Sequence, residues 1–92
     1  MEIICINDVF SIDQKRDFPN LPVEGSIYTV RDVVRSQVGT GLLLNEIENP
    51  KVGWTMRNGM KFTFEPNFSI NRFTTLLGEP LTREVVDEKI TA

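Results

Sequence analysis

The sequence of 92 residues predicts a mostly β protein, a small barrel followed by a short C-terminal α-helix. The first observation is the run 23–30, in which a turn glycine, Gly25, leads into β-branched and aromatic residues. The second is the alternation of apolar and polar residues on both sides of Asn58-Gly59, which is typical of a hairpin. The third is the spacing of apolar residues in the tail, which follows one face of a helix.

Composition places the chain among globular proteins with a single core. Apolar residues at 40% and charged residues at 25% indicate neither disorder nor a membrane class. A net charge of −3 disfavours binding to nucleic acid or to an anionic membrane. The N-terminus has no signal-peptide pattern, and the single cysteine, Cys5, lies in an apolar run, so we expect a cytoplasmic protein with a buried thiol.

Short apolar runs closed by turn residues predict the first strands. Residues 2–6 form a buried strand, and the polar segment 11–20 shows no sustained period, so it is predicted to be a long loop. Further strands are predicted over 26–34 and 41–47. The loop is expected to tuck its apolar side chains against the barrel: Phe10, Ile12 and Phe18. One face of the second strand is expected to carry Tyr28, Val30 and Val34.

The segment 52–65 is predicted to be an extended distal hairpin. A two-residue turn at Asn58-Gly59 would place its two apolar rows on opposite faces. A three-residue loop over 57–59, with Gly59 left-handed, opposes Met56 with Met60 and brings both rows to one face. That face then contains Val52, Trp54, Met56, Met60, Phe62 and Phe64.

The C-terminal part is predicted to contain a short strand, a 3₁₀ turn and a helix. Ile70 and Phe73 are three residues apart, which suits a single 3₁₀ turn after an extended start. Thr82 is the expected N-cap of the tail helix, whose apolar stripe comprises Leu81, Val85, Val86 and Ile90. A helix of this length is marginal alone, so we expect a barrel over 1–78 and a tail over 79–92 that docks on the barrel or on a partner chain.

This order of elements resembles an SH3-like barrel. The chain is also similar to a family of small SH3-like barrel proteins from bacteria and their phages, through Gly-x-x-Tyr-Thr-Val, Gly-Leu-x-Leu-x-Glu-Ile and Ser-x-x-Arg-Phe-x-x-Leu segments. Here these are 25–30, 41–47 and 69–76. The resemblance implies the fold and a phage setting, and it implies no particular activity. Thr74-Thr75 stands where the family pattern has a basic residue and a proline.

The sequence gives little support for catalysis. Histidine is absent, which removes the commonest general base and metal ligand. Asp8, Asp13 and Asp17 lack the spacing of a calcium loop, and Gly39-Thr40-Gly41 leads into a strand rather than into a helix N-terminus. We therefore expect no enzyme, no metal and no cofactor.

Four residues are candidates for binding a ligand or a partner. Arg31, Arg35 and Arg72 carry guanidinium groups that suit phosphate or carboxylate, although solvated barrel surface explains them as well. Arg31 and Arg35 are expected on the same face of the second strand. Phe18 lies in the loop that borders the peptide groove of SH3-like barrels. For Trp54, the register favours the core over an interface.

Two functions remain open on this basis. The first is a non-catalytic binding module that acts through a protein partner or through self-association. The second is a phage-type sponge that sequesters an anionic nucleotide signal through paired arginines.

Overall fold

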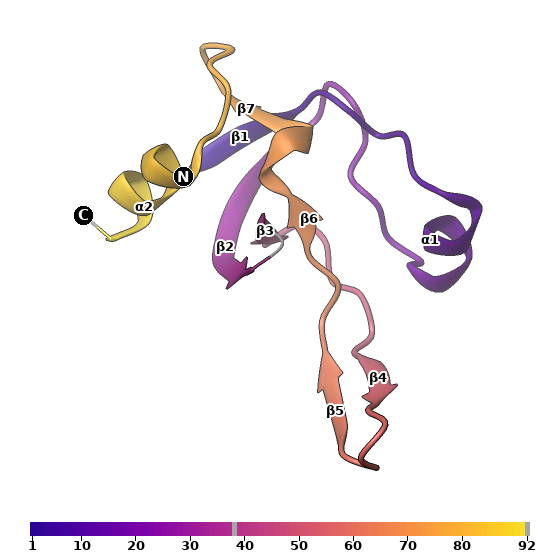
Figure 1. Ribbon diagram of the computed structural model, residues 1–92. Helices are drawn as coiled ribbons and strands as arrows, with labels where there is room; N and C mark the ends of the chain where they lie inside the picture. The colour runs from indigo at the N-terminus through magenta and orange to yellow at the C-terminus, as the bar shows by residue number, and fades with distance from the viewer. Residues whose placement is uncertain (38, 92) are drawn as a thin grey trace.

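The computed structural model describes residues 1–37 and 39–91, without the side chains of Trp54, Phe62 and residues 89–91. Its elements, in chain order, are β1 (Glu2–Cys5), α1 (Ile12–Asp17), β2 (Ile27–Ser36), β3 (Gly39–Leu44), β4 (Val52–Thr55), β5 (Lys61–Phe64), β6 (Phe68–Ser69), the 3₁₀ turn η1 (Ile70–Arg72), β7 (Phe73–Thr75) and α2 (Arg83–Thr91). Figure 1 shows a curved central sheet, with α1 and α2 on different sides and β4 and β5 extending away from it.

The central sheet is antiparallel and has the strand order β6-β3-β2-β1-β7. The long strand β2 pairs with β1 through its first half and with β3 through its second half, so it connects the two ends of the sheet. The predicted β-rich fold with a 3₁₀ turn and a C-terminal helix is confirmed. Among the described residues the sheet stays open, because no pairing joins β6 to β7.

A β-bulge corrects the predicted faces of β2. The register shifts between Val30 and Asp32. The inward and outward alternation of side chains is therefore interrupted at this point and does not continue from the first half of the strand into the second. Val30 and Val33 both pack against the core, whereas Val34 lines a groove on the other side of the sheet. The predicted common face of Tyr28, Val30 and Val34 is therefore wrong, because the extra residue of the bulge reverses the orientation of the second half of the strand.

One buried cluster holds the sheet, the loop and the tail together. Ile3, Leu42 and Val86 are fully buried, and they come from β1, β3 and α2. Thr82 caps α2 as predicted, since its hydroxyl accepts a hydrogen bond from the backbone of Val85 at 3.2 Å. The whole cluster comprises Ile3, Cys5, Phe10, Tyr28, Leu42, Leu44, Ile47, Phe68, Phe73, Leu81 and Val86. The apolar stripe of the tail thus packs on the same chain. The side chain of Ile90 lies outside the described part of the structure.

The segment between β1 and β2 contains a helix where a loop was predicted. Ser11 caps α1, and Ser11 and Gln14 form a reciprocal capping box. The Ser-x-x-Gln spacing was the available sequence signal, but the helix is too short to show a period. Phe10 is buried as expected and Phe18 is half-buried, whereas Ile12 is 85% exposed and does not tuck against the sheet.

The hairpin β4–β5 has the predicted register. Val52 pairs with Phe64 and Trp54 with Phe62. The backbone N–H of Met56 donates to the carbonyl of Met60 at 2.8 Å, and Gly59 has φ +84°. This hairpin, which we call the arm (residues 51–65), projects from the sheet (Figure 1). The arm explains why the radius of gyration is 13.9 Å, against about 12 Å for a compact chain of this length.

Candidate functional site

Arg72 anchors the start of the loop between β1 and β2. Its guanidinium donates to the carbonyls of Asn7 and Val9 at 3.2 and 2.8 Å. The same group lies over the ring of Phe10, 3.9 Å from its centroid. Phe10 in turn meets Phe68 edge to face. Arg72 therefore has a structural role that the sequence did not predict, because its partners are more than sixty residues away.

Hydrogen bonds of Tyr28 and of a pair of asparagines anchor the end of that loop. The hydroxyl of Tyr28 accepts a hydrogen bond from the backbone of Val23 at 2.8 Å. Asn20 and Asn49 exchange hydrogen bonds of 2.9 and 2.8 Å between backbone and side-chain amide. Hydrogen bonds from η1, from β2 and from the segment after β3 therefore hold both limbs of the loop against the body of the protein.

Arg31 and Arg35 each have an acidic partner within the chain. Arg31 binds Glu65 at the base of the arm through two 2.8 Å contacts. Arg35 pairs with Asp87 on α2. An anionic ligand would therefore compete with a carboxylate at each guanidinium.

The predicted site residues are spread over several contacts. Arg31 contacts the arm, Arg35 contacts α2, and Arg72 contacts the loop. Phe18 is the C-cap of α1 and is half-buried. The structure shows no shared cluster of these four side chains among its hydrogen bonds and ion pairs.

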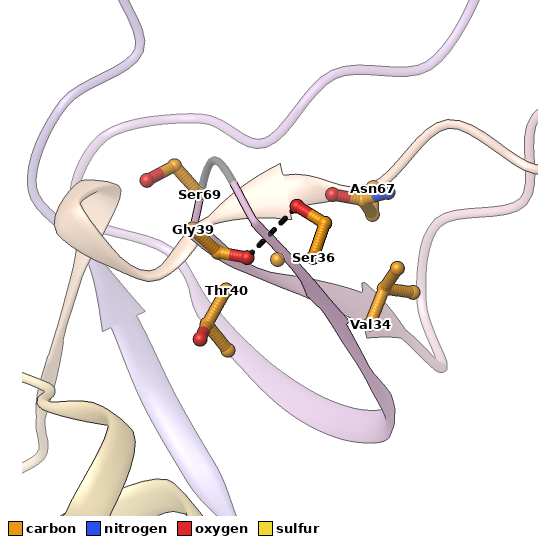
Figure 2. Close-up of a pocket in the computed structure, with 7 residues that line it drawn as sticks. Val34, Ser36, Gly39, Thr40, Asn67 and Ser69 are labelled. Atoms are coloured by element: carbon orange, nitrogen blue, oxygen red, sulfur yellow. Dashed lines mark hydrogen bonds between the residues drawn. The ribbon is translucent and has the colours of Figure 1, made fainter.

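A shallow groove of about 290 Å³ lies at the end of the sheet where β2, β3 and β6 meet. Gly39 and Gly41 form its floor, since their positions in β3 carry no side chain. Figure 2 shows the side chains along the two walls, with Ser36 donating to the carbonyl of Gly39 at 3.1 Å. The lining consists of Val34, Ser36, Gly39, Thr40, Gly41, Asn67 and Ser69.

The chemistry of the groove is neutral. None of its lining residues carries a charge, so it suits an uncharged polar group rather than a phosphate. The amide of Asn67 covers Gly41 so closely that a Cβ there would lie 1.8 Å from its Oδ1. From the sequence, Gly39-Thr40-Gly41 was considered only as a phosphate-binding loop, and the groove was missed because one wall comes from Asn67 and Ser69, far along the chain.

The arm carries exposed apolar side chains at the end of β5 and where its two strands meet the turn. Met56 is 47% exposed, Met60 is 63% exposed and Phe64 is 38% exposed. The side chain of Trp54, predicted to lie in the core, is outside the described residues. The core position that the register favoured for Trp54 does not extend along this face, because Met56 and Met60 are exposed although the register is as predicted.

The arm is also basic. Between Lys51 and Phe64 the sequence contains Lys51, Arg57 and Lys61 and no acidic residue. Among the described ion pairs none involves these three cations. This run of basic residues without an acidic one is visible in the sequence. It was not used as a signal for a binding surface, because attention went to the alternation of apolar residues in the same segment.

The remaining chemistry of the described residues is sparse. Burial raises the pKa of the Cys5 thiol above its usual range, which keeps the thiol protonated and unreactive. In the part of the chain that the structure describes, no group of histidine, cysteine and carboxylate residues has the arrangement of a metal site. Among the same residues, no helix has both the length and the apolar character required to span a membrane.

Comparison with protein-family models, with curated proteins and with solved structures gives no match for this chain.

Proposed function

We propose that this protein is a non-catalytic binding module that acts through a protein partner or through its own copies, and that the arm is its binding surface. The observation that carries this proposal is the exposure of Met56 and Met60 on a ribbon that projects from the sheet. Exposed apolar side chains that gather on one part of a protein surface are typical of interaction sites.

The energetics of the arm support a binding role. Isolated two-stranded hairpins are marginally stable in water, and both strands of the arm have one unpaired edge among the described pairings. Methionine side chains adapt to irregular partner surfaces because they are unbranched and polarisable. A partner that covers the apolar face would stabilise the arm and gain its hydrophobic contacts at the same time.

The proposal includes an SH3-like class for the central sheet. Its support is the order β6-β3-β2-β1-β7, the long strand β2 shared by both halves, and a 3₁₀ turn directly before the last strand. A cytoplasmic location, a phage setting and the absence of catalysis belong to the same proposal. They rest on the sequence patterns and on the resemblance described above.

The alternative, an arginine-based nucleotide sponge, receives less support. Arg31 and Arg35 are paired with Glu65 and Asp87, and Arg72 is used to anchor the loop. The groove between β2, β3 and β6 has no cationic lining either.

Site-specific photo-crosslinking tests the binding module. A photoreactive amino acid at position 56, on the arm, is compared with one at position 77, where Leu77 is 89% exposed on a turn of the body. The captured protein is identified by mass spectrometry and its purified form is titrated against wild type and Met60→Asp. We expect capture from position 56 and at least about tenfold weaker binding by the variant, because a buried methionine contributes roughly 1.5–3 kcal/mol. If wild type and Met60→Asp bind the partner with equal affinity, the arm is not the binding surface.

A further inference from the structure

The charge of this chain is divided between the arm and the rest of the molecule. Residues 51–65 contain three basic residues and one acidic residue, and the acidic one, Glu65, is paired with Arg31. The remaining residues contain seven basic and twelve acidic residues, a net charge of −5. A basic arm on an acidic body indicates that the arm is attracted to a surface like its own body.

A matching surface lies at the base of the loop between β1 and β2. Val9 is 76% exposed and Val23 is 56% exposed. The two limbs that carry them are joined by a hydrogen bond of 3.2 Å from the backbone of Glu24 to the carboxylate of Asp8. Ile6 is 47% exposed, and its backbone N–H is tied to the carbonyl of Arg72. We call this surface the loop-base patch: Ile6, Asp8, Val9, Val23 and Glu24.

The two surfaces complement each other in both polarity and charge. The arm offers the exposed Met56 and Met60, with the cation Arg57 in the turn between them, and the patch offers Val9 and Val23 close to two carboxylates. Asp8 and Glu24 make no ion pair among the described residues, and neither does Arg57. The guanidinium of the nearby Arg72 is engaged by two carbonyls and by the ring of Phe10.

We propose that the arm of one copy docks on the loop-base patch of a second copy, and that the second copy returns the same contact to form a closed two-fold dimer. This inference rests on the proposed function, because it names the occupant of the arm. A two-fold exchange uses the arm–patch contact twice. A stable interface buries about 1,200 Å² in total over both partners, so each of the two arm–patch contacts needs to account for only about half of that area.

Charge reversal with subunit mixing tests the exchange. Arg57→Glu places a negative charge on the arm, and Glu24→Lys places a positive charge on the patch. In a dimer of either variant both contacts carry like charges. In a mixed dimer one contact carries the reversed pair and the other the native pair, so both are again favourable.

The measurement is sedimentation equilibrium of the full chain from micromolar to millimolar concentration, at low and at high salt. We expect wild type to dimerise, each variant alone to dissociate about tenfold more readily, and the equimolar mixture to recover dimers near the wild-type level. The emission of Trp54, the single tryptophan of the chain, gives a second readout from β4. Lys61→Glu is the control of equal charge change, since the register places Lys61 on the face opposite to Met56 and Met60, and its effect should be clearly smaller.

Three results would overturn the inference. If wild type stays monomeric over the whole concentration range, the two copies do not exchange arms. Dimers that are weakened by Arg57→Glu but not by Glu24→Lys have a different occupant, such as the arm of the second copy. A mixture that remains as dissociated as its components has no reciprocal contact. If wild type is monomeric and position 56 still crosslinks to a partner whose affinity depends on Met60, the proposed function stands and this inference alone fails.

Discussion

The central sheet and the arm each place alternate apolar residues on one face, and these two faces reach opposite degrees of burial. In β3, Leu42 and Leu44 alternate with Gly41 and Leu43, and the two leucines are at most 1% exposed. In the arm, the apolar residues alternate just as regularly, yet Met60 is 63% exposed. Alternation therefore determines which side chains share a face. Whether that face is covered depends on other elements that come from far along the chain.

The sheet is covered because several segments converge on it. The tail helix supplies Val86, the loop supplies Phe10, and the 3₁₀ turn positions Arg72 beside that loop. The arm has the β4–β5 ladder and the ion pair of Glu65 with Arg31 at its base. This difference predicts that the sheet and the arm respond very differently to equivalent substitutions.

The largest expected effect is the loss of a core aromatic ring. Phe73→Ala should reduce the free energy of unfolding by about 3–5 kcal/mol, because Phe73 is 1% exposed and its removal leaves a cavity. Met60→Ala on the arm should change it by no more than about 0.5 kcal/mol. Urea denaturation at a concentration where the protein is monomeric measures both. Comparable losses would show that the arm belongs to the cooperative core.

An intermediate effect is expected at the anchor of the loop. Arg72→Ala should cost about 1.5 kcal/mol, at the low end for hydrogen bonds to a charged group, because the side chain is half-buried. Hydrogen exchange should accelerate in residues 7–10 and remain unchanged in the arm. Arg35→Ala is the control, since its ion pair with Asp87 is about two-fifths exposed and should contribute less than about 1 kcal/mol. If both variants lose the same free energy of unfolding, Arg72 contributes no more to stability than an ordinary surface ion pair.

The smallest effects distinguish one glycine in the sheet from one in the arm. Gly41→Ala should destabilise by about 1 kcal/mol, because the amide of Asn67 must move away from the new methyl group. Gly53→Ala meets no atom within 4 Å and should stabilise the arm by about 0.5 kcal/mol through a lower backbone entropy. Thermal unfolding monitored by circular dichroism and amide exchange in the arm measure the two changes. Shifts of the same sign would contradict the difference in packing between the two strands.

Local features of the fold could be predicted from the sequence by itself. The left-handed Gly59, the opposition of Met56 and Met60, and the cap at Thr82 all depend on residues within a few positions of one another. Such features follow from backbone dihedral preferences and from short-range hydrogen bonds, which nearby residues determine. The helix α1 was missed because six residues are too few to show a helical period.

The tertiary structure alone decided the surfaces that bear on function. The bulge next to Arg31 reversed the second half of β2, and the partners of Arg31 and Arg35 lie 34 and 52 residues away. The exposure of Met60 depends on where the arm projects. Pairing and burial at such separations are set by how whole elements pack together. A pattern within one segment specifies its own geometry and carries no information on which distant segment will cover it.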